Sequence, residues 1–231
     1  MKYLVAVILA CICCSSLVYG QARRHYGHLF PIIADASPDN PIERSGKGRN
    51  AILNDGDEKW NSVSGDPHCN GAVYCISDDI YRPIIGGEFD SINGQQIRGI
   101  GRYRKDDDST FTEIGGGISG GAVRAIYETY ESGHKIFAAG NFTTAGGISV
   151  NNITYWDDNG WHAMGTGTNS TVLALTLVGD LLYVGGNFTR AGDSTANYIA
   201  IWNIKTNQWS PIIVDGVNGM DGGVACLTND Y

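Results

Sequence analysis

A repeat of about 50 residues is the sequence feature that most constrains the fold of this chain. Three separate landmarks keep this period. Apolar runs begin at four valines: Val73, Val123, Val172 and Val224. A Gly-Gly-x-Phe or Ala-Gly-x-Phe motif ends at three phenylalanines: Phe89, Phe142 and Phe188. An aromatic residue closes each unit: Trp60, Phe111, Trp161 and Trp209. Because independent landmarks share one period, the chain is predicted to consist of copies of one structural unit.

The unit that begins at Val172 is the clearest, and its pattern predicts four short strands separated by turn residues. Gly179 and Asp180 form a hairpin signal between the first two strands. The predicted strands are 172–177, 181–185, 198–202 and 208–213. A four-stranded meander repeated at this length is typical of a β-propeller blade. We therefore expect an all-β fold without helices.

The order of motifs in this unit resembles the kelch repeat: an apolar strand, Tyr-Val-Gly-Gly, a loop, an aromatic residue with Asn or Asp, and a closing Trp. The longer pattern Gly-Gly-Asn-Phe-Thr-x-Ala-Gly at 185–192, followed by Asn-x-Ile-x-x-Trp at 197–202, is similar to the repeats of the fungal cortical cell-polarity marker family (Rax-type). The resemblance covers about residues 48–231. It implies kelch-like four-stranded blades at a cell surface, and it does not specify a function.

The repeat divides the chain into parts that differ in completeness. Three full blades and two partial ones are fewer than a closed propeller typically requires. We therefore expect a propeller that is incomplete or open in this chain, and either a fragment or closure by self-assembly. The expected parts are a signal peptide (1–20), a divergent lead-in (21–47), a blade tail (48–63), blades at about 73–122, 123–171 and 172–223, and the start of another blade (224–231).

The N-terminus has the pattern of a secretory signal peptide. Lys2 precedes an apolar run, and Val18 and Gly20 suit a cleavage before Gln21. An uncleaved anchor is the main alternative, although the run is short for a membrane span. We expect a secreted or extracellular protein, with a cell-surface location as the other option.

The charge and the cysteines narrow the possible partners and bonds. Asp and Glu number 24 against 16 Lys and Arg, so a basic nucleic-acid surface is not expected. Three of the six cysteines lie within the predicted signal peptide. An exported protein can form disulfides, and Cys69–Cys75 is the predicted bridge. Alternatively, Cys75 and Cys226 are small buried apolar residues.

Four Asn-x-Ser/Thr sequences are candidates for N-glycosylation in a eukaryotic host. Asn169 is the first choice because it lies in a Gly/Thr/Ser-rich loop between blades, and Asn152 is intermediate. Asn141 and Asn187 occupy one repeat position, so the repeat itself could explain them as turn residues.

No pattern for catalysis, a metal or a cofactor is recognised. The pair His25 and His28 is the closest approach to a ligand spacing, and the acidic runs 54–58 and 105–108 are interpreted as hairpin turns. The first hypothesis is a non-catalytic module that binds or adheres to a protein or carbohydrate ligand. The alternatives are an exported propeller enzyme, of oxidase or glycosidase type, with its active residues in blades absent here, and a truncated fragment without independent function.

Overall fold

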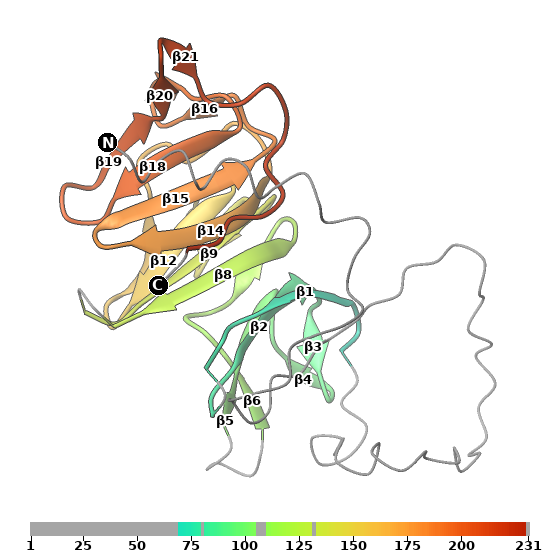
Figure 1. The fold of residues 1–231 in the computed structure, drawn as a ribbon. Coiled ribbons are helices and arrows are strands. Elements are labelled where there is room, and N and C mark those ends of the chain that lie inside the picture. The colour runs from blue at the N-terminus through green and yellow to red at the C-terminus, as the bar shows by residue number, and fades with distance from the viewer. Residues whose placement is uncertain (1–68, 80, 105–109, 131–132, 230–231) are drawn as a thin grey trace, which may run out of the picture. The chain divides into compact units, whose positions relative to one another are not determined.

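Three four-stranded antiparallel sheets form the described part of the chain (Figure 1). The computed structural model describes residues 69–79, 81–104, 110–130 and 133–229, and these belong to one compact unit. They contain no helix, and accordingly none that could cross a bilayer. The predicted signal peptide, lead-in and blade tail, with His25, His28 and both acidic runs, lie outside the described residues. The all-β prediction is confirmed.

Each sheet is a meander in which the strands follow one another with a short hairpin inserted before the third. The first sheet contains β1 (Ala72–Ile76), β2 (Ile84–Glu88), β5 (Ile100–Arg104) and β6 (Thr110–Glu113). The second contains β8 (Val123–Thr129), β9 (Lys135–Gly140), β12 (Ile153–Asp157) and β13 (Gly160–Ala163). The third contains β14 (Val172–Val178), β15 (Leu181–Gly186), β18 (Ile199–Asn203) and β19 (Gln208–Pro211).

The segments between the second and third strands contain small hairpins. These are β3 (Ser91–Ile92) with β4 (Gln95–Gln96), β10 (Thr144–Ala145) with β11 (Ile148–Ser149), and β16 (Arg190–Ala191) with β17 (Ser194–Thr195). Strand β10 also pairs with β7 (Ile118–Ser119), and a last hairpin joins β20 (Ile213–Val214) to β21 (Val217–Asn218). The two-residue turns Asn93-Gly94, Gly146-Gly147 and Asp215-Gly216 have positive φ at both positions, which is the geometry of tight hairpins.

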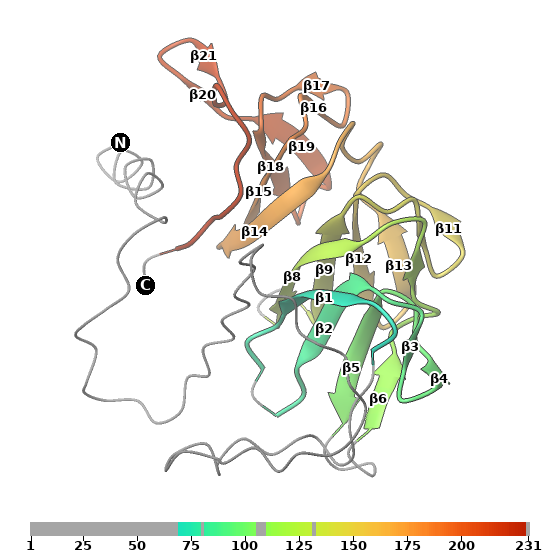
Figure 2. The same cartoon turned by 90° about the vertical axis from the view of Figure 1, so that its right-hand side faces the viewer.

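Neighbouring sheets meet through their first strands. Strand β8 contacts both β1 and β14, and the three are neighbours in Figure 1 and Figure 2. Each first strand has a β-bulge after its opening valine, at Val73, Val123 and Val172. A repeated bulge bends each first strand in the same place, so the three sheets present equivalent edges to one another.

Small residues in the second strand make room for the next sheet. A methyl group added to Gly86 would lie 2.6 Å from Val123 Cγ1, and one added to Gly185 would lie 2.6 Å from Val224 Cγ1. The Val224 amide also donates to the Gly186 carbonyl at 3.1 Å. The segment from Val224 therefore lies against the third sheet as β8 lies against the first.

Tryptophan indoles add a polar bond across each junction. The Trp161 Nε1–H donates to the Ile114 carbonyl at 3.2 Å, and the Trp209 Nε1–H donates to the Met164 carbonyl at 2.7 Å. Both acceptors lie just after the last strand of the preceding sheet. Trp161 is buried and Trp209 is partly buried, and each satisfies its indole donor at the junction.

The core consists of the layers between sheets. One cluster joins the first and second sheets through residues such as Ile84 and Phe142, and another joins the second and third through Phe137 and Leu182. Strand β1 differs, because Val73 is 46% exposed whereas Val123 is fully buried. The described residues leave the outer face of β1 uncovered.

Candidate functional site

The candidate site is a cleft of about 460 Å³ between the first and second sheets. Strands β5 and β6 supply one wall, and the ends of β8, β9 and β12 supply the other. Its volume falls within the range of small-molecule sites. The lining residues are Arg82, Arg102, Arg104, Thr112, Glu113, Ile114, Gly115, Tyr130, His134, Ile136, Trp156 and Asp158.

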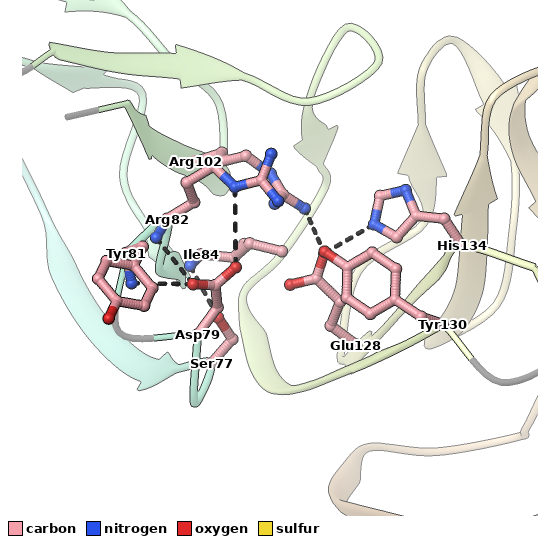
Figure 3. Close-up of polar contacts among 9 residues, drawn as sticks. All are labelled: Ser77, Asp79, Tyr81, Arg82, Ile84, Arg102, Glu128, Tyr130 and His134. Carbon is pink, nitrogen blue, oxygen red and sulfur yellow. Dashed lines mark hydrogen bonds and ion pairs between the residues drawn. The ribbon is translucent and has the colours of Figure 1, made fainter. Parts of the chain in front are cut away.

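Beneath the cleft, a buried carboxylate holds three lining side chains. Glu128 Oε1 accepts from Arg102 Nη2 at 2.6 Å and from the Tyr130 hydroxyl at 3.0 Å, and it lies 2.7 Å from His134 Nε2 (Figure 3). The Glu128 side chain is 3% exposed and that of Arg102 is 11% exposed. A charge-assisted bond at this depth fixes the guanidinium in one orientation. Glu128 does not line the cleft, so it acts as a positioning residue.

Aromatic rings form the second wall. Tyr130 and His134 are stacked with their centroids 4.7 Å apart, and the His134 ring meets Trp156 edge-on at 5.7 Å. Burial, followed by the nearby Glu128 carboxylate, raises the pKa of Tyr130 above its ordinary value. The phenol is therefore protonated near neutral pH and donates to Glu128.

Two further arginines stand near the mouth. The carboxylate of Asp79 accepts from the Tyr81 and Arg82 amides at 2.9 Å each, and it lies 3.9 Å from Arg82 Nε. Burial alone would raise the pKa of Asp79, but these amides and the charges of Arg82 and Arg102 outweigh it and leave the pKa below its usual value. Arg104 Nε donates to Thr112 Oγ1 at 3.2 Å. Arg102 and Arg104 are two residues apart on β5, so they face the same side.

The carboxylates on the cleft wall offset this charge only in part. Glu113 is bound to Arg98, which lies outside the lining, through an ion pair of 3.1 Å. Arg82 and Arg102 are likewise paired, with Asp79 and Glu128. The lining therefore carries charges of both signs, three arginines and two carboxylates, in a chain whose net charge is −8.

The corresponding junction between the second and third sheets is apolar. Strand register equates Glu128 with Leu177, because they lie opposite Ile136 and Leu182 in equivalent pairs. It likewise equates Arg102 with Tyr155. Leu177 belongs to a hydrophobic cluster, and Tyr155 packs against it. Among the three described sheets, the charged pair therefore occurs at the first junction only, where it departs from the repeat.

The sequence-predicted glycosylation sites lie apart from this cleft. Asn152 and Asn169 both line a second, more open hollow of about 420 Å³. The Asn152 Nδ2 donates to the Thr168 carbonyl at 2.7 Å, and the Asn169 Nδ2 donates to Thr189 Oγ1 at 3.0 Å. Asn141 and Asn187 are exposed just after β9 and β15. Whether any of the four carries a glycan stays a prediction.

The predicted Cys69–Cys75 disulfide is absent from the structure. Cys69 lies in an isolated bridge with Ile92, whereas Cys75 lies on β1 with its thiol toward the Val123 carbonyl, 3.9 Å away. Burial raises the pKa of Cys75 to about 12, although a bond with Gly86 works against the rise. Cys75 fits the alternative reading, a small side chain within the sheet junction, whereas Cys226 is exposed.

Sequence reasoning missed Arg102, Glu128, Tyr130 and His134. Each residue type is unremarkable alone, and His134 has no ligand-like spacing. The available signal was Glu128, a charged residue at a repeat position where the next unit has Leu177. Among the described residues, no group of three or more His, Cys, Asp and Glu side chains could hold a metal ion.

No protein-family model and no curated protein matches this chain. The resemblance to kelch-type repeats therefore remains a hypothesis that rests on the residues themselves.

Proposed function

We propose that this protein is an exported, non-catalytic binding module of β-propeller type, which recognises a ligand in the cleft between its first two sheets. Three four-stranded meanders with neighbouring first strands support the propeller architecture. The predicted signal peptide supports the extracellular location.

The observation that carries the binding role is the charged pair at the first junction. Leu177 and Tyr155 show that an apolar pair suffices at this position, and replacing buried ion pairs by apolar residues is often neutral or stabilising. Glu128 Oε2 is also buried without a hydrogen-bond partner in the described part of the chain, which is a cost to folding. We infer that Glu128 and Arg102 serve recognition rather than stability.

The geometry favours binding over catalysis. Glu128 Oε1 is engaged by three side chains and lies under the cleft wall, so it orients its neighbours instead of facing a ligand. Arg102, Tyr130 and His134 consequently form a preorganised surface, which lowers the entropic cost of binding.

The test is a variant that converts the first junction into the second, Arg102→Tyr with Glu128→Leu. The wild-type protein is expected to bind members of a mixed array of glycans and peptides, and the converted variant is expected to fold but to lose that binding. Thermal unfolding verifies the fold of both. Equal binding by the two proteins, or no binding by the wild type, would overturn the proposal.

A further inference from the structure

The lining of the cleft defines the chemistry of its ligand. The three arginines carry N–H donors. Arg102 donates from Nη2 to Glu128. A guanidinium has five N–H donors in a planar fork that matches a carboxylate. A fixed Arg102 beside Arg104 is therefore suited to a carboxylate group.

The aromatic part of the lining suits a ring with an apolar face. Trp156 and the Tyr130–His134 stack lie beside Arg102, because Arg102, Tyr130 and His134 contact the same oxygen of Glu128. Aromatic faces bury flat apolar surface well. A simple inorganic anion would leave this wall without a contact, so charge alone does not explain the lining.

Polar groups at the edge suit hydroxyls. The Asp158 carboxylate is an acceptor on the cleft wall, and Thr112 contributes a hydroxyl. A carboxylate, an apolar ring face and several hydroxyls occur together in acidic sugars. The volume of about 460 Å³ suits a small ring compound rather than a folded partner.

We propose that the cleft between the first and second sheets binds a carboxylate-bearing saccharide, with its carboxylate at Arg102 and Arg104 and its ring against Trp156. This inference rests on the proposed binding function and gives it a ligand class. Uronic acids and sialic acids share this chemistry.

Titration calorimetry of the full chain tests the ligand class with four probes: a galacturonate trisaccharide, sialyllactose, lactose and a short oligoglutamate peptide. We expect binding to one or both acidic sugars and no binding to lactose or to the peptide. The two acidic probes show which source of the carboxylate fits. Preference for lactose or for the peptide would overturn the ligand class and leave the proposed function standing. Absence of binding to all four probes would overturn the ligand class alone. The function would be overturned as well only if the mixed array were blank or if the converted variant bound it as well as the wild type.

A rim variant tests the arginine contact without disturbing the buried pair. Arg104→Gln is expected to weaken binding of the acidic sugar roughly tenfold, since a charge-assisted contact is lost. Arg190→Gln is the matched control, because Arg190 is exposed and lines the other hollow. Equal effects of the two substitutions would contradict the assignment of the carboxylate to this wall.

Discussion

Glu128 shows how one residue changes a repeated position. A carboxylate with 3% exposure is costly to bury unless it is paired. Arg102 provides the pairing charge from the neighbouring sheet, and His134 and Tyr130 come from beyond the end of β8. Two sheets are therefore joined here by a polar contact that depends on every member.

Replacing Arg102 alone should lower the free energy of unfolding more than replacing Arg102 and Glu128 together. Arg102→Met leaves Glu128 buried without its cation and is expected to lower the free energy of unfolding by about 3 kcal/mol. The double variant Arg102→Tyr with Glu128→Leu should recover most of this loss, because the second junction carries Tyr155 and Leu177. Urea unfolding of the wild type, of Arg102→Met, and of the double variant with its single changes Arg102→Tyr and Glu128→Leu measures the differences. A double variant as unstable as the sum of these two single changes would show that the two residues are not coupled.

The Cys75 thiol should be inert while the protein is folded. Its pKa is raised to about 12 by burial, and only the thiolate reacts with alkylating reagents. At pH 8 we expect iodoacetamide to modify the exposed Cys226 quickly and Cys75 slowly, as peptide mass spectrometry would show. In urea both should react alike. Rapid labelling of Cys75 in the folded protein would contradict its placement in the junction.

At the scale of elements, the second strand of each sheet sets the distance to the next sheet. Gly86 faces Cys75 and Val123, whereas the equivalent Ala139 in the second sheet is paired with Ala125. A larger thiol on the first strand is thus accompanied by a glycine on the second. The third sheet pairs Ala174 with Gly185, so we expect a shared volume for Cys75 and Gly86 and do not extend it to every unit.

A double-mutant cycle tests this shared volume. Gly86→Ala places a methyl group 2.8 Å from Cys75 Sγ and should destabilise the protein by about 1–3 kcal/mol. Adding Cys75→Ala should restore part of the loss, because the pair then matches Ala125 and Ala139. Gly94→Ala is the control. It has positive φ and no atom within 4 Å, so it should cost about 1 kcal/mol independently of Cys75.

Most large strands could be predicted from the sequence, because alternation and glycine pairs directly report buried pleated segments. The small hairpins were missed, since two-residue strands carry no periodicity. The Asn93-Gly94 turn is the part of them that the sequence does signal, through a residue pair that favours positive φ. The cleft was missed for a different reason: Arg102 and Glu128 meet only when two sheets pack, and neither lies in a local motif.

At the scale of the whole molecule, the structure changes the order in which we expect the Asn-x-Ser/Thr sites to be glycosylated. Asn152 has φ of 65°, and the equivalent residues Gly99 and Tyr198 also have positive φ. Asparagine tolerates this left-handed backbone conformation, so the conformation by itself explains an asparagine at this position. Its partner Thr154 is buried and donates to the His162 carbonyl at 2.8 Å. Asn141 and Asn187 are exposed.

Expression in a eukaryotic secretory host should therefore give higher glycan occupancy at Asn141 and Asn187 than at Asn152. Glycopeptide mass spectrometry measures the occupancy of each site. Thr143→Ala retains Asn141 and removes its acceptor sequence, so it should abolish that glycan alone. Occupancy at Asn152 equal to that at Asn141 would show that folded-state exposure does not govern modification.

The indole bonds across the junctions have a consequence for ancestry. Each acceptor is a main-chain carbonyl, so it persists whether residue 114 is isoleucine or residue 164 is methionine. For this contact a unit supplies its own tryptophan and needs from the preceding unit only that carbonyl and a nearby glycine, Gly115 or Gly165. Unlike the Arg102–Glu128 pair, the indole bond would therefore persist if a gene segment that encodes one unit were copied, exchanged or lost.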